Sequence, residues 1–271
     1  MGQRLIAFAF SRMRMKRCAN LRRRRMAVCW AATLLAASSL LDLSYIAQCA
    51  PQLRTMTDAG VPLNEPIVVR VRGVILRVPA GYLWPWPTRE MQGRVHDWDS
   101  VAFDFWMPDR RYPEFNPLSL LSFRPKERGR PPAPPDAYVV EVRQMQPVKL
   151  NEPGYVSPER GFRNLTSISA ISSYSFENQK FGLVRFWQHD WPYPQPEPFT
   201  RYRQPEGSDP QVLLHCTPPD RTSGTPLCSG TVHFAASDLG FFVVFPREVV
   251  SQWRDITQAA DELFKSWKVQ P

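Results

Sequence analysis

Proline is the residue that most restricts what this chain can fold into. All 28 prolines lie after residue 50, within residues 51–271. Because proline lacks a backbone N–H and fixes its own φ angle, it interrupts helices and the interior strands of sheets. The proline density therefore argues against an all-helical body, and we expect short strands joined by stiff, irregular connections. A body of this length can bury a substantial core, in one large domain or two small ones.

Short runs of β-branched and aromatic residues predict the strands of this body. Each run is bounded by proline, glycine or polar residues, as strands of a sheet usually are. We predict strands at residues 66–78 (one or two strands), 101–107, 138–145, 168–174, 182–188, 212–216, 231–235 and 240–245. The body is thus expected to be mainly antiparallel β-sheet.

One helix is predicted at residues 248–268, because apolar side chains recur there every three or four residues. The apolar stripe consists of Val249, Trp253, Ile256, Ala260, Leu263, Phe264 and Trp267. Packing of this stripe on the sheet would give an α+β fold with a C-terminal amphipathic helix. A lipid-facing helix is the alternative, although such helices usually carry a cationic polar face and this one is mixed in charge.

Two long connections, residues 108–136 and 191–210, are rich in proline and poor in regular signals. Loops of this length commonly carry function. The first connection is also a candidate boundary between two subdomains, residues 62–107 and 138–271.

The first 50 residues combine a basic flank with an apolar run. Nine basic residues lie between Arg4 and Arg25, ahead of an uncharged apolar stretch at residues 27–41. Such a pattern predicts a basic cytoplasmic flank (residues 1–25), an export signal or anchor (26–50) and a periplasmic body (51–271). The body keeps 25 basic and 24 acidic residues, so the net charge of +9 reflects targeting and implies no nucleic-acid partner.

The end of the apolar run leaves three alternatives open. Residues 46–49 resemble a lipoprotein signal in which Cys49 would receive the lipid, although Gln48 occupies the position usually held by a small residue. Ordinary cleavage near residues 47–50 and retention as an uncleaved anchor are the other two. In each case the body is periplasmic, and either lipidated Cys49 or residues 26–50 would attach it to the inner or outer membrane.

The exported body contains two cysteines, Cys216 and Cys228, separated by a loop rich in proline and glycine. In an oxidising compartment such a pair is expected to form a disulfide. A zinc site with His215 and His233 is the alternative. It is disfavoured because adjacent residues of a strand point to opposite faces, and because the spacing matches no usual ligand pattern. We therefore predict a disulfide, no metal and no cofactor.

The usual local signatures of catalysis are absent from the sequence. There is no Gly-x-Ser-x-Gly elbow, no phosphate-binding glycine loop and no His-Glu-x-x-His motif. His96 beside Asp97, or His189 beside Asp190, could orient a base for a serine hydroxyl, but adjacent residues of an extended segment diverge. We predict that the protein is not an enzyme, and keep a periplasmic hydrolase as an alternative.

Aromatic residues and prolines cluster at residues 82–87 and 191–194. These rings could form a rigid contact surface for a partner, or fill the core beneath the loops. Arginines of the first long connection could steer an acidic partner. The candidate partner-binding residues are Trp84, Trp86, Arg110, Arg111, Arg128, Arg130, Trp191 and Tyr193.

Residues 73–83, residues 101–109, the cysteine pair and the helix at 253–267 together resemble a loosely defined group of exported proteobacterial proteins. Members of this group often sit beside type VI secretion effectors, including lipases, and are thought to act as immunity proteins. The resemblance implies a binding protein that neutralises a secreted antibacterial effector in the periplasm, and it supplies no catalytic residues. The basic loop at residues 108–135 departs from the pattern of the group, so the partner is not carried over. A structural or accessory envelope lipoprotein is the alternative from another class.

Overall fold

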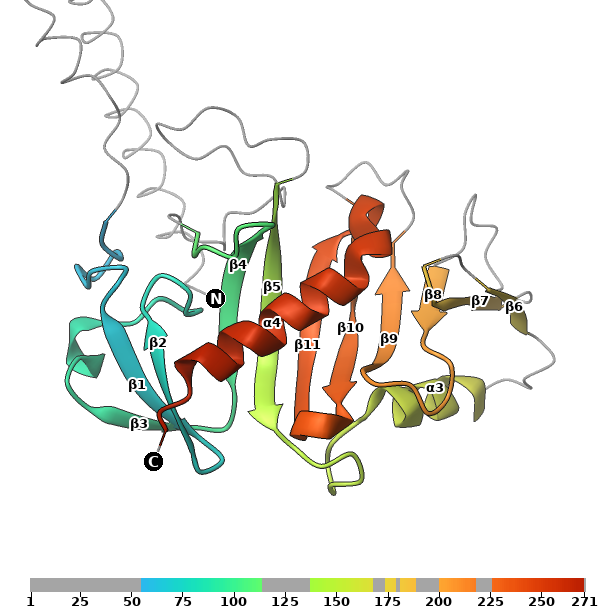
Figure 1. The fold of residues 1–271 in the computed structure, drawn as a ribbon, viewed down its shortest axis with the longest axis horizontal. Helices are drawn as coiled ribbons and strands as arrows, with labels where there is room; N and C mark the ends of the chain where they lie inside the picture. The colour runs from blue at the N-terminus through green and yellow to red at the C-terminus, as the bar shows by residue number, and fades with distance from the viewer. Residues whose placement is uncertain are drawn as a thin grey trace, which may run out of the picture. The chain divides into compact units, whose positions relative to one another are not determined.

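In the computed structural model of this protein, the described residues are 55–113, 137–167, 174–178, 181–188, 200–217 and 226–270. They form a three-stranded sheet and an eight-stranded sheet, and a long helix, α4, lies across one face of the larger sheet (Figure 1). The fold is α+β and mainly antiparallel, with the C-terminal helix packed on the sheet, as the sequence predicts.

The small sheet has the strand order β2-β1-β3. Its strands β1 (Pro66–Val71) and β2 (Val74–Pro79) form an antiparallel hairpin, which confirms the strands predicted at residues 66–78. Arg72 and Gly73 connect them with φ angles of 49° and 86°, as a two-residue hairpin turn requires. The third strand, β3 (Val95–Trp98), pairs parallel with β1 and was not predicted, because none of its four residues is fully buried.

The large sheet has the strand order β4-β5-β11-β10-β9-β8-β7-β6, and each neighbouring pair is antiparallel. Its strands are β4 (Val101–Met107), β5 (Tyr138–Pro147), β6 (Tyr174–Asn178), β7 (Val184–Gln188), β8 (Thr200–Arg203), β9 (Gln211–Cys216), β10 (Leu227–Phe234) and β11 (Leu239–Pro246). Six of these agree with predicted strands to within a few residues. The strand predicted at 168–174 overlaps β6 only at Tyr174, and its other residues lie outside the described ranges.

Helix α4 (Trp253–Trp267) follows a short 3-10 helix, η5 (Arg247–Gln252). Its apolar stripe is buried as predicted, with Trp253 and Ile256 fully inaccessible to solvent. The ring centroid of Trp267 lies 4.8 Å from that of Phe103 on β4. Because the sheet occupies the apolar face of α4, the alternative of a lipid-facing helix is wrong.

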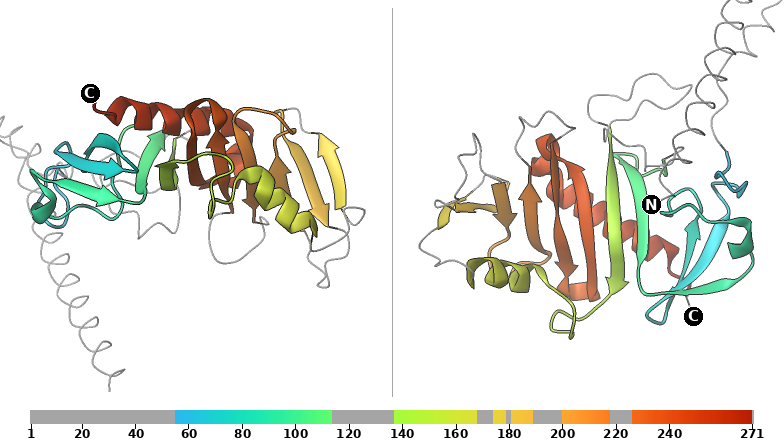
Figure 2. Two further views of the ribbon diagram at one scale, coloured as in Figure 1. Left: turned by 90° about the horizontal axis from the view of Figure 1, so that it is seen from below. Right: turned by 180° about the vertical axis from the view of Figure 1, so that it is seen from behind.

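A second helix, α3 (Pro158–Ser167), was not predicted. Figure 2 shows it on the face of the large sheet opposite to α4. It packs there through Phe162, whose ring centroid lies 5.2 Å from that of Phe186 on β7. The backbone N–H of Arg160 donates to Ser157 Oγ at 3.3 Å, so Ser157 caps the helix. Serine followed by proline is a helix-start signal that the prediction overlooked, because Gly161 weakens the helical pattern.

Both predicted subdomains contribute strands to the large sheet and residues to one core. Strand β4 precedes the long connection at residues 108–136 and β5 follows it, yet the two strands pair with each other. The core includes Val69 of the small sheet and Val243 of the large one. The large sheet is therefore continuous across the predicted boundary at residues 108–136.

Residues 1–54 lie outside the described ranges, and with them the export segment and Cys49. Their targeting role stays a prediction. Within the part of the chain that is described, no helix combines the length and apolar character needed to cross a membrane.

A candidate binding pocket at the edge of the large sheet

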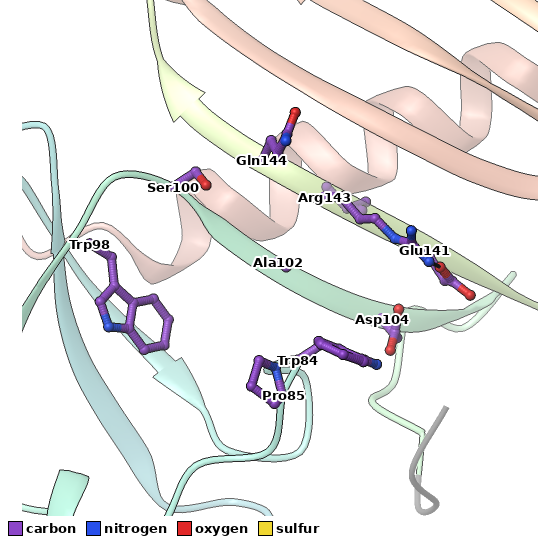
Figure 3. A pocket seen from close by; sticks show the side chains of 10 residues that line it. Trp84, Pro85, Trp98, Ser100, Ala102, Asp104, Glu141, Arg143 and Gln144 are labelled. Atoms are coloured by element: carbon purple, nitrogen blue, oxygen red, sulfur yellow. Dashed lines mark hydrogen bonds and ion pairs between the residues drawn. The ribbon is translucent and has the colours of Figure 1, made fainter. Parts of the chain in front are cut away.

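A pocket of about 540 Å³ lies where the small sheet meets the edge of the large one. Two tryptophans and a proline form one wall, and strands β4 and β5 form the other (Figure 3). The lining residues are Trp84, Pro85, Trp98, Ser100, Ala102, Asp104, Glu141, Val142, Arg143 and Gln144.

Backbone pairing with the outer edge of β4 brings Trp84 to this pocket. The N–H of Trp84 donates to the carbonyl of Ala102 at 2.9 Å, and the N–H of Asp104 donates to the carbonyl of Tyr82 at 2.9 Å. Residues 82–84 thus cover an edge that would otherwise expose unpaired backbone groups. The position of Trp84 is therefore fixed by main-chain geometry.

The hydroxyl of Tyr82 anchors the same segment from its other side. It donates to the carbonyl of Arg110 at 2.8 Å, and its ring packs against Trp267 of α4 with centroids 5.1 Å apart. Burial, with smaller contributions from Tyr112 and Asp109, raises the pKa of Tyr82 to about 12. The hydroxyl therefore keeps its proton and its role as a donor.

Trp98 reaches the pocket from the small sheet. It is the last residue of β3, where it is the register partner of Val71 on β1. Its half-buried indole packs against the common core. The small sheet thus holds the indole of Trp98, and the segment at residues 82–84 holds the indole of Trp84.

Strands β4 and β5 place charged side chains on the second wall. Asp104 and Glu141 are direct partners in the register of the two strands. Because side chains alternate along a strand, Phe103 packs on α4 while Asp104 points to the opposite face. Figure 3 shows Asp104, Glu141 and Arg143 on the side of the strands away from α4.

The three groups differ in their partners. Glu141 forms an ion pair with Arg143. Asp104 is 4% exposed, and no hydrogen bond to its carboxyl is present among the described residues. Desolvation, reinforced by the neighbouring Glu141 charge and partly offset by Arg143, raises the pKa of Asp104 well above its ordinary value. The carboxyl of Asp104 is thus biased toward its neutral form.

The arrangement is suited to binding. Most of the surface that lines the pocket is apolar, and a few polar groups lie in it, as in sites that hold a ligand or a partner side chain. None of the described residues that line it is a histidine or a cysteine. An activated nucleophile with an adjacent imidazole base is therefore absent from this part of the described structure.

The structure places only some of the predicted partner-binding residues. Trp84 lines the pocket, and Trp86 lies two residues further on and is half-buried. Arg128, Arg130, Trp191 and Tyr193 lie outside the described ranges, so their role stays a prediction.

Two predicted arginines, Arg110 and Arg111, follow β4 and form contacts within the protein. Arg110 forms an ion pair with Glu262 of α4. Arg111 pairs with Asp109 at 3.0 Å, and its guanidinium lies 4.8 Å from the ring centroid of Trp106. Both arginines are partly exposed, so their contacts leave room for a steering role that stays untested.

Of the described residues that line the pocket, only Trp84 was predicted, and the aromatic and charged ones that were missed are Trp98, Asp104, Glu141 and Arg143. One signal was available for Asp104, because an acidic residue stands inside an otherwise apolar strand at residues 101–107. A carboxyl in that setting must be paired, neutral or functional.

The predicted disulfide between Cys216 and Cys228 is present. The two residues are direct partners on β9 and β10, and both are fully buried. His215 is adjacent to Cys216, and His233 is five residues from Cys228, so both imidazoles lie on the other face of the sheet. The zinc alternative is therefore wrong, and no group of potential metal ligands is found within the described ranges.

The suggested pairing of His96 with Asp97 does not form. His96 Nε2 lies 3.2 Å from the carbonyl oxygen of Met91, whereas Asp97 pairs with Arg70 at 2.9 Å. The other candidate base, His189, lies outside the described ranges.

No protein-family model matches this chain, and no curated protein matches its sequence. A similar solved structure is that of an immunity protein of the Stenotrophomonas maltophilia type IV secretion system. The two are 13% identical, the match covers 80% of this chain and 98% of that chain, and the TM-score is 0.52. This likeness shows that the chain shares its fold with that immunity protein.

Proposed function

We propose that this chain is an immunity protein, exported to the periplasm, that binds a secreted antibacterial effector and neutralises it. The observation that carries the proposal is the fold shared with a secretion-system immunity protein over 80% of this chain. The resemblance of its short motifs to exported immunity proteins points the same way. Binding would act by covering the active site of the effector or by blocking its assembly.

The proposal also concerns the type of secretion system that delivers the effector. The motif resemblance favours a type VI effector, such as a lipase, whereas the similar structure belongs to a type IV system. Both alternatives give this chain the same task, and they differ in the machine that delivers the effector. Attacker strains that lack one machine or the other distinguish them.

Export is also proposed. It is supported by the basic flank and apolar run of the first 50 residues, and by a disulfide that forms readily in oxidising compartments. Attachment to the membrane, through residues 26–50 or a lipidated Cys49, would keep the protein where an incoming effector arrives.

The pocket beside β4 is the proposed contact site. Tryptophan gives a large contact area at little cost in conformational entropy, and interface energy concentrates in such residues. Replacing Trp84 by alanine should weaken effector binding by about 2 kcal/mol or more. Trp187 on β7, a half-buried tryptophan of the large sheet, provides the matched control.

Competition between sibling strains tests the proposal. A strain that lacks this gene should be outcompeted by its armed parent, and should survive when the attacker lacks the delivering machine. Expression of the intact gene in the deletion strain should restore survival. If the deletion strain competes as well as its parent against every armed attacker, the immunity proposal fails, and the envelope-accessory alternative takes its place.

A further inference from the structure

Asp104 is the most deeply buried polar residue among the described residues that line the pocket. It is 4% exposed, lines the pocket, and accepts no hydrogen bond among the described residues. A buried polar group without a partner is costly, so such groups in folded proteins usually call for an explanation. A partner that arrives from outside would provide one.

The charges around Asp104 indicate which kind of partner. Glu141 and Arg143 neutralise each other through their ion pair, so ionisation of Asp104 would leave one uncompensated negative charge. An apolar occupant would leave the carboxyl unsatisfied, and an anionic one would add repulsion. A cation satisfies both its hydrogen bonding and its charge.

The opposite wall fits the same occupant. The indoles of Trp84 and Trp98 line the pocket together with the ring of Pro85. Tryptophan faces attract ammonium and guanidinium groups, and they also pack on the apolar stems that carry these groups. The volume of about 540 Å³ leaves ample room for one long side chain.

We propose that this pocket holds a basic side chain, arginine or lysine, of the bound effector. Its cationic group lies against the Asp104 carboxyl, and its aliphatic stem packs against Trp84 and Trp98. The identity of the partner rests on the proposed immunity function, whereas the preference for a cation rests on the pocket alone.

Binding should also release a proton. Among the described residues that line the pocket, the charged ones are Asp104 on β4 and the Glu141–Arg143 pair on β5. Burial keeps Asp104 biased toward its neutral form while the pocket is free, and an incoming cation favours the ionised form. Affinity for a cation should therefore rise with pH.

Capped amino acids test the preference directly. The probes are N-acetyl-arginine methylamide, its neutral near-isostere N-acetyl-citrulline methylamide, and the apolar N-acetyl-norleucine methylamide. They are titrated into the purified full-length chain in mild detergent, followed by NMR. The arginine probe should bind at least about tenfold more tightly than either control probe, a ratio equivalent to about 1.4 kcal/mol.

Variants assign any binding to this pocket. Asp104→Asn should remove the preference for arginine, and Trp84→Leu should weaken every probe. Asp255→Asn, which alters an exposed carboxylate on α4, should change nothing. Asparagine matches the volume of the neutral carboxyl, so the variant should fold, and its thermal unfolding is measured beside that of the wild type.

Three results would overturn the proposal: equal affinity for arginine and norleucine, undiminished binding by a folded Asp104→Asn variant, or no binding of any probe. A strain carrying Asp104→Asn separates this proposal from the immunity function. If the wild-type gene protects and the folded variant protects equally, the pocket does not hold the effector. If the wild-type gene gives no protection, the immunity proposal fails, and the probe titration still decides the preference for a cation.

Discussion

Asp104 and Glu141 are direct partners across the β4–β5 ladder, so two acidic side chains lie next to each other on one face of the sheet. Like charges in this relationship destabilise a sheet. The protein avoids the repulsion by pairing Glu141 with Arg143 and by burying Asp104, whose pKa is raised well above 3.8. Burial first, and then the Glu141 charge that strand register places beside it, thus favour the neutral form of Asp104.

Replacing Asp104 by asparagine should change how stability depends on pH. Because the folded state binds this proton more tightly than the unfolded chain, the contribution of Asp104 is complete at low pH. It declines as pH rises above the unfolded pKa of 3.8 and through the folded pKa. Asparagine cannot ionise, so the melting temperature of the variant, measured relative to that of the wild type, should increase as pH rises above 3.8. A constant difference would show that Asp104 is ionised in the fold.

Removing the disulfide should destabilise the protein without changing its fold. In the chain-entropy model, the loop closed by Cys216 and Cys228, twelve residues apart, contributes about 3 kcal/mol. Urea unfolding of a Cys216→Ala, Cys228→Ala variant should show this loss, and a reductant should affect only the wild type. Two free thiols in peptides from the exported protein would contradict the bond.

His233 should make the protein sensitive to mild acid. It is fully buried, and neither ring nitrogen has a hydrogen-bond partner among the described residues. Desolvation lowers its pKa below 6.5, against the smaller opposing effect of Asp238 and Asp209. The unfolded chain therefore takes up this proton first, so the stability that neutral His233 provides falls as pH drops below 6.5.

Substitution by leucine tests the contribution of His233. His233→Leu should reduce the loss of stability between about pH 7.5 and about pH 5. The loss should not vanish, because burial also lowers the pKa of His215. An unchanged dependence on pH in the leucine variant would show that His233 finds a partner in solution.

The elements that were predicted correctly carry their signal within one segment. Strand β4 is apolar except for Asp104, and α4 repeats its apolar residues every three or four positions. Strand β8 was missed because its four residues, Thr200–Arg203, are too few to show alternation beside the prolines that precede them.

The pocket could not be predicted because its walls meet only through long-range pairing. Trp84 is placed by a backbone contact with Ala102, and Glu141 by the pairing of β4 with β5 across the long connection. Trp84 was predicted because it is an aromatic residue near prolines, and this local property is independent of the long-range contacts that form the pocket. Trp98 and Asp104 gain their role from neighbours that the local sequence does not reveal.

Topology provides a further prediction. The basic flank before Met26 should hold the N-terminus inside the cell, so residues 51–271 should be periplasmic. Alkaline phosphatase fused after Pro271 should be active, and a β-galactosidase fusion at the same point should be inactive. Activity of the cytoplasmic reporter alone would exclude export.

The central claim is that this chain neutralises a secreted effector. The most direct measurement is the viability of cells that produce the effector that kills the deletion strain, directed to the periplasm, with and without this chain. The account predicts that the effector alone kills, that co-production of the intact chain restores growth, and that Trp84→Ala weakens the rescue more than Trp187→Ala does. Equal killing in the presence and absence of the intact chain, produced at comparable levels, would contradict it.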